Sequence, residues 1–136
     1  MAILKKGPLD AILSGKKVVE SRFTRTRRVP FGQISREDKI FLKLSSSAVC
    51  GRCVVDGIEQ FEDLSPQKIN KLKSKYNHLI LGDEQYWQSK RDSRYGVLVW
   101  LKDVRAIKPV LIDKNDWRAW VMLTDKNNYG LIKCWS

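Results

Sequence analysis

The sequence lacks any long hydrophobic run, since no stretch of its 136 residues stays apolar over the roughly 20 residues that a bilayer-spanning helix needs. Its first ten residues, MAILKKGPLD, hold only a three-residue apolar run before the lysines. A secretory signal needs roughly 7–15 apolar residues after its charges. We therefore expect a soluble, cytoplasmic protein with no membrane partner.

Cysteine and histidine are scarce, at three residues and one residue. An odd number of cysteines without an export signal argues against a disulfide framework. Cys50 and Cys53 have the spacing of half a zinc site, and Cys134 with His78 could complete it. The first pair falls in an expected strand, where residues three apart point to opposite faces. We therefore expect no metal site.

Nucleotide-cofactor signatures are missing as well. The chain has neither a Walker A loop nor a G-x-G-x-x-G segment. His78 follows a lysine-rich segment and has no serine, cysteine or carboxylate motif around it, which argues against a catalytic triad. We expect no bound cofactor.

Acidic residues are outnumbered, because 15 Asp and Glu stand against 26 Lys and Arg, for a formal net charge of +11 and a pI near 9.8. The excess is uneven: residues 1–28 hold eight basic and two acidic residues, a net charge of +6. Such a field favours a polyanionic partner, above all a nucleic acid. An anionic membrane surface attracts the same charges, and some basic domains are merely soluble.

Hydrophobic periodicity and turn residues predict the following elements. We expect helices at 8–13, ended by Gly15, from Pro66 after a capping Ser65, and from Asp83 to about Lys90. We expect strands at 18–23, 39–44, 48–60 and 95–104, a binding loop at 24–38, and a short edge segment within 109–123. Strands mixed with a few helices and no βαβ repeat predict an α+β fold, a curled mixed sheet or small barrel flanked by short helices.

The same pattern predicts a single domain over residues 1–136. Residues 124–136 form a tail that could dock on the body of the domain or on a second copy of the chain, so the oligomeric state stays open.

The strongest local signal is the segment from Gly15 to Arg22, which reads G-x-K-x-x-E-x-R through Gly15, Lys17, Glu20 and Arg22. Strand alternation places Glu20 and Arg22 on one face. The segment resembles the signature of the ASCH (activating signal cointegrator homology) family, and the order of the surrounding elements over residues 2–123 is similar too. The resemblance implies a PUA-like β-barrel, related to RNA-binding domains, in which the signature residues line a cleft.

Each signature residue suits the binding of a nucleotide. Gly15 allows a tight turn, Lys17 offers a mobile charge for phosphate, and Arg22 offers a planar fork for bidentate contact or stacking. Glu20 can hold both cations or accept from a base edge. The alternative is an ordinary exposed ion pair between Glu20 and Arg22 with Lys17 solvated.

Some ASCH-like proteins are enzymes, which makes Lys17 and Glu20 candidate catalytic residues. One branch resembles amidohydrolases of acetylated cytidine and another member is similar to a ribonuclease, both using the motif lysine. The amidohydrolase branch has threonine where this chain has Glu20, and it needs a glutamate from a later helix, for which Glu84 is the plausible counterpart. A Glu20 carboxylate would raise the pKa of Lys17, whereas a catalytic base needs a lowered pKa.

The loop after Arg22 adds Arg25, Arg27 and Arg28, interleaved with hydroxyls, and can grip phosphates or be a solvated charge run. Most of the five tryptophans are expected in packing, with one near the cleft able to stack a base. The leading hypothesis is a protein that binds single-stranded RNA or a nucleotide, with DNA as a possible partner. The alternatives are a metal-independent hydrolase of RNA or a modified nucleoside using Lys17, and a protein-interaction adaptor.

Overall fold

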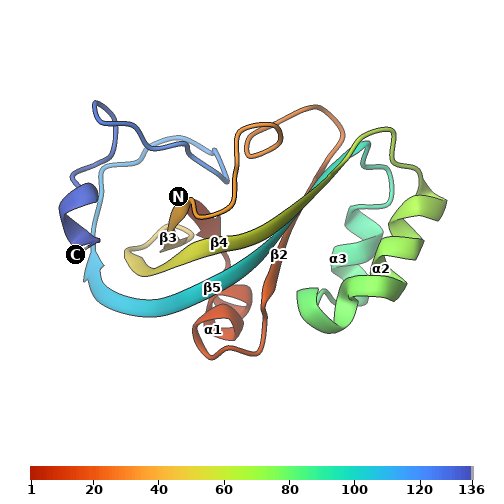
Figure 1. Ribbon diagram of the computed structural model, residues 1–136, viewed down its shortest axis with the longest axis horizontal. Coiled ribbons are helices and arrows are strands. Elements are labelled where there is room, and N and C mark those ends of the chain that lie inside the picture. The colour runs from red at the N-terminus through yellow and green to blue at the C-terminus, as the bar shows by residue number, and fades with distance from the viewer. Residues whose placement is uncertain (136) are drawn as a thin grey trace.

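Two long strands, β4 (Val49–Phe61) and β5 (Tyr95–Val110), cross the molecule and carry the other elements (Figure 1). The computed structural model describes residues 1–135. β3 (Lys39–Leu44) pairs antiparallel with β4, and β2 (Val19–Thr24) pairs antiparallel with β5. β1 (Ala2–Leu4) runs parallel to β3, which gives the strand order β1-β3-β4-β5-β2. The predicted α+β fold with a mixed sheet is confirmed, and the sheet curls without closing into a barrel.

The strands follow the expected apolar segments, and the differences have local causes. β3 has the predicted bounds, whereas β5 runs six residues beyond the predicted end at 104. Asp103 has a left-handed φ of 51°, and the pairing of β5 with β4 shifts register there, so strict alternation is lost although the strand continues. The short edge segment expected within 109–123 is limited to an isolated antiparallel bridge between Trp120 and Ala2 of β1.

α2 (Pro66–Ile80) and α3 (Glu84–Ser89) begin after the predicted capping residues, whereas α1 (Lys6–Leu13) begins two residues before its predicted start. α2 starts after Ser65, whose hydroxyl accepts from the Lys68 N–H at 3.3 Å. α3 starts after Asp83, whose carboxylate accepts from the Tyr86 N–H at 2.7 Å. α1 is followed by Gly15, which has a φ of 82° and donates its N–H to the Ile12 carbonyl at 3.1 Å. None of the helices in residues 1–135 is both long and apolar enough to cross a membrane.

Register shifts in β4 change the environment of its cysteines. The pairing with β5 shifts at three places, two of which flank the segment from Gly51 to Arg52. Cys53 is fully buried in the core and Cys50 packs partly buried against the same cluster, so the expectation that they occupy opposite faces is wrong. Burial raises the pKa of the Cys53 thiol to about 12. Within residues 1–135, no three His, Cys, Asp or Glu side chains gather as they would around a metal ion.

The segment after β5 passes beside β1, to which Trp120 makes a bridge, and its end packs against β3 and β4 through contacts of Trp135 with Phe41 and Arg52. Leu131 is fully buried in a cluster with Met1, Phe41, Val49 and Val121. The tail therefore docks on its own chain through residue 135, and Ser136 lies outside the described residues.

The docked tail predicts a stability difference between two neighbouring positions. Leu131→Ala should lower the free energy of unfolding by about 2–5 kcal/mol, because it empties a fully buried site. Ile132→Ala should change it by less than about 0.5 kcal/mol, because Ile132 is 54% exposed. Urea titrations followed by circular dichroism measure both. A loss of stability that depends on protein concentration would instead place Leu131 in a contact between two copies of the chain.

Candidate functional site

Lys17 lies at the junction of three elements. After Gly15 turns the chain, the Lys17 N–H donates to the Ala11 carbonyl of α1 at 3.0 Å, and the side chain turns inward. Its ammonium donates to the Ile80 carbonyl, at the last residue of α2. A cation there also interacts favourably with the dipole of that helix. Lys17 is only 6% exposed, so its first role is to connect α1, α2 and β2.

Glu20 lies between the two cations of the motif. Its Oε1 is 3.7 Å from the Lys17 ammonium and its Oε2 is 3.3 Å from the Arg22 guanidinium. Oε1 also accepts from the Ser21 N–H at 2.9 Å. Because Glu20 is buried, its charge is held by these partners rather than by water.

Arg22 spans the gap between the two open edges of the sheet. From β2 its guanidinium donates to the Ile3 carbonyl of β1 at 3.2 Å and to the Ala119 carbonyl at 3.1 Å. The guanidinium also lies over the Trp120 ring, 5.2 Å from the centroid. Its Nε is buried without a hydrogen-bond partner among the described residues. A side chain thus joins strands that the backbone leaves unpaired.

The structure therefore brings Lys17, Glu20 and Arg22 together, with Gly15 as the turn that precedes them. The alternative of an exposed Glu20–Arg22 pair beside a solvated Lys17 is wrong, because their side chains are 9%, 17% and 6% exposed. Two pockets within residues 1–135, of about 210 and 440 Å³, lie elsewhere, and neither is lined by a signature residue. One of them, of about 210 Å³, includes Trp120 and so adjoins Arg22.

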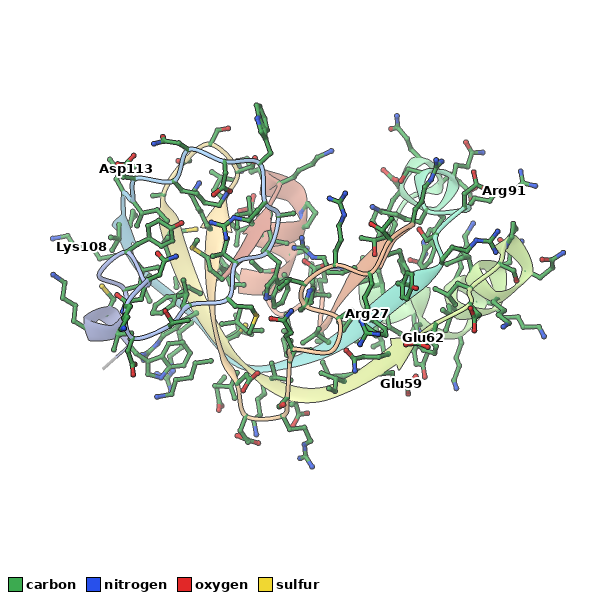
Figure 2. The ribbon with its side chains drawn as sticks, turned by 90° about the horizontal axis from the view of Figure 1, so that it is seen from above. Arg27, Glu59, Glu62, Arg91, Lys108 and Asp113 are labelled. Carbon is green, nitrogen blue, oxygen red and sulfur yellow. The ribbon has the colours of Figure 1, made fainter. Side chains whose placement is uncertain are left out.

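The three loop arginines lie apart from this cluster. Arg25 pairs with Asp92 at 3.6 Å, and the Arg28 Nε donates to the Thr26 hydroxyl at 3.1 Å. Figure 2 shows Arg27 close to Glu62, with which it pairs at 3.7 Å. All three arginines are exposed. They are available to a ligand, but within residues 1–135 none of them forms a hydrogen bond or ion pair with Lys17 or Glu20.

Three residues that sequence reasoning missed, Lys5, Tyr86 and Lys90, lie near the signature residues. The Tyr86 hydroxyl of α3 lies 2.6 Å from the Ser21 hydroxyl, and burial raises the pKa of this phenol well above its usual value. The Lys90 ammonium lies over the Tyr86 ring at 5.6 Å. The pKa of Lys90 is lowered, first by burial and then by the charges of Arg22 and Lys5. No local sequence signal marks these residues, because they reach the site from the N-terminal end of α1 and from α3.

The pKa of Lys17 departs from the sequence-based expectation. Burial lowers it, and this effect outweighs the Glu20 carboxylate, which raises it. Glu84, the residue proposed to assist Lys17, is 80% exposed and pairs with Lys73 at 2.7 Å. The site therefore holds one lysine of lowered pKa beside one carboxylate, and Glu84 is not its second acid.

The fold is similar to solved structures of one protein. No protein-family model matches the sequence, and no curated protein matches it significantly. The structure of ASCH from Zymomonas mobilis has 22% identity and a TM-score of 0.72, covering 97% of this chain and 92% of that chain. A serine-to-alanine variant of it has 22% identity and a TM-score of 0.75, covering 98% and 93%. A tyrosine-to-phenylalanine variant has 25% identity and a TM-score of 0.63, covering 80% and 72%.

The electrostatics of the site predict how Lys17 titrates. Its folded pKa lies below the ordinary 10.5, so the folded state holds that proton less tightly than the unfolded chain does. This cost to stability is present at neutral pH and disappears as the pH rises toward 10.5. Glu20→Gln should lower the Lys17 pKa further, because it removes the charge that raises it. NMR titration of ¹³Cε-labelled lysines measures this, and an unchanged or higher Lys17 pKa in Glu20→Gln would contradict the arrangement.

Proposed function

We propose that this protein, which has the fold of the ASCH family, binds single-stranded RNA or a single nucleotide through the cations that surround Glu20. The phosphate contacts come from the solvent-facing members of that group. Lys17 and Glu20 are buried and hold these cations in position.

The observation that carries this proposal is an excess of positive charge around one carboxylate. Lys17 and Arg22 both contact Glu20, so that one buried carboxylate faces two cations, a local excess of +1. The pKa of Lys90 is lowered by burial and then by the charges of Arg22 and Lys5, which adds two further cations to the neighbourhood of Arg22. A phosphate group would supply the missing negative charge and relieve the repulsion between the cations.

Exposure separates the roles of these cations. Lys5 is exposed and Lys90 is half-buried, so both ammonium groups can reach a ligand, whereas Lys17 is buried. Trp117 is fully exposed and precedes Ala119, whose carbonyl accepts from Arg22, by two residues. An exposed indole beside a cationic site is suited to stacking an unpaired base. Together these residues favour a single strand over a duplex.

The binding proposal predicts a loss of RNA affinity that depends on which lysines are substituted rather than on the total charge removed. Lys5→Ala/Lys90→Ala should weaken binding of an end-labelled single-stranded RNA about tenfold and reduce the slope of log affinity against log salt by about 1.4. Lys71→Ala/Lys126→Ala removes the same charge from exposed positions and should have a smaller effect. Native gels over a range of salt concentrations measure both. Equal losses of RNA affinity in the two double variants would mean that RNA binds to the positive charge of the whole protein and not to the site around Glu20.

A second candidate function, hydrolysis of RNA or a modified nucleoside, is favoured by the lowered pKa of Lys17. A lowered pKa makes the neutral amine more accessible, and a neutral amine can act as a base or nucleophile. The Glu20 carboxylate at 3.7 Å could then accept or return a proton. Strand alternation places the Ser21 hydroxyl, and the Tyr86 hydroxyl that it contacts, on the face of β2 opposite to Glu20. These hydroxyls could therefore orient a substrate only if it reached around β2, which is an edge strand of the sheet.

A time course distinguishes binding from hydrolysis. We expect wild-type protein to shift the labelled RNA on native gels and leave it intact on denaturing gels. Cleavage by the wild type that disappears in a folded Lys17→Met variant would establish the hydrolase instead. Thermal melting confirms folding of the variant, and Lys16→Met is the control because Lys16 is exposed.

A further inference from the structure

A cationic pocket lies on the face of the sheet that carries Arg52, near the docked tail. It has a volume of about 440 Å³ and is lined by Arg52, Val54, Asp103, Arg105 and Trp135. Arg52 and Cys53 are neighbours on β4, but Cys53 is buried in the core, where the charge of Glu20 raises its pKa. Arg52 is part-exposed and contacts Trp135 of the docked tail instead. The pocket and the Glu20 site thus lie on opposite sides of the sheet.

Strand register gathers like charges in this pocket. Arg52 on β4 pairs directly with Arg105 on β5, and on its other side it pairs with Phe41 of β3. Like charges in directly opposite positions destabilise a sheet. Lys39 lies two residues before Phe41 and reaches the same Trp135 ring. Among residues 1–135, no carboxylate forms an ion pair with Arg52, Arg105 or Lys39.

The tail holds an aromatic ring against these cations. The Trp135 ring packs edge-on against Phe41, with the centroids 5.3 Å apart. The Arg52 guanidinium and the Lys39 ammonium lie 5.0 and 5.3 Å from the Trp135 centroid. Since Leu131 anchors the tail in the core, the ring has a defined place at the side of the pocket. Cations and an indole around one hollow are the groups that recognise a phosphate with an attached base.

We propose that this pocket is a second nucleotide-binding site, which holds one unit of a single-stranded RNA by its phosphate and its base. Arg52 and Arg105 bind the phosphate, and Lys39 adds charge at the rim. The base lies against Trp135 and Val54, and the Asp103 carboxylate accepts a hydrogen bond from a ribose hydroxyl. The site is independent of the proposed site at Glu20, and a strand long enough to reach both would bind more tightly than a short one.

An acidic peptide is the competing ligand, because its carboxylates would also neutralise the arginines. The lining of the pocket favours the nucleotide, since a peptide carboxylate would leave Trp135 and Val54 without a flat partner. The Asp103 carboxylate repels a phosphate and a peptide carboxylate alike, but only the nucleotide offers a ribose hydroxyl from which it accepts a hydrogen bond.

The experiment follows the indole N–H resonance of Trp135 in ¹⁵N-labelled full-length protein, assigned with Trp135→Phe. Adenosine monophosphate is titrated into wild type, Arg52→Ala/Arg105→Ala and Arg91→Ala/Lys71→Ala. The last variant removes the same charge from exposed positions, and Figure 2 shows Arg91 at the opposite end of the molecule from Lys108, which follows Arg105 on β5. Inorganic phosphate and a polyglutamate peptide are titrated in parallel.

We expect adenosine monophosphate to shift the Trp135 resonance in the wild type and in the control. Arg52→Ala/Arg105→Ala should weaken this binding at least about tenfold, because two charge-assisted contacts are lost. Lys5→Ala/Lys90→Ala should leave it unchanged, which separates this site from the proposed function. The proposal is overturned if the nucleotide leaves Trp135 unmoved, if phosphate alone binds equally well, or if only polyglutamate shifts the resonance.

Discussion

The buried carboxylate of Glu20 is the interaction on which the rest of this structure depends. It neutralises Lys17, which connects α1 to the end of α2, and Arg22, which connects β2 to β1. Breaking a buried ion pair by removing one partner leaves an uncompensated charge in the interior, at a cost of about 3–5 kcal/mol. One carboxylate therefore stabilises contacts among the first three elements of the chain, β1, α1 and β2, and joins them to the distant α2.

This arrangement explains how positive charge gathers where the sheet is open. A closed barrel would satisfy the strand edges with backbone hydrogen bonds. Here the guanidinium of Arg22 takes that place by donating to the carbonyls of Ile3 and Ala119. A side chain in that position also brings charge, and Lys5 and Lys90 add to it from the flanking helical segments. The Arg22 guanidinium therefore both joins the edges formed by β2 and β1 and contributes positive charge between them.

Positive charge occurs on both sides of the sheet, but its setting differs. Around Glu20 the cations are partly buried and share one carboxylate. On the opposite face, strand register sets Arg52 and Arg105 opposite each other, and Trp135 of the tail adds an aromatic ring. Two such sites would let a single strand pass over more than one face of a small protein.

The sequence by itself determined the local features of this protein. Ser65 and Asp83 cap their helices, Gly15 ends α1, and the motif through Glu20 identified the resemblance, because capping and turn chemistry act between residues close in the chain. Only the tertiary structure decided that Lys17 is buried with a lowered pKa. It also brought Lys90 to Arg22 and Trp135 to Arg52. Desolvation and contacts between distant segments depend on packing, and no spacing of residues along a chain encodes them.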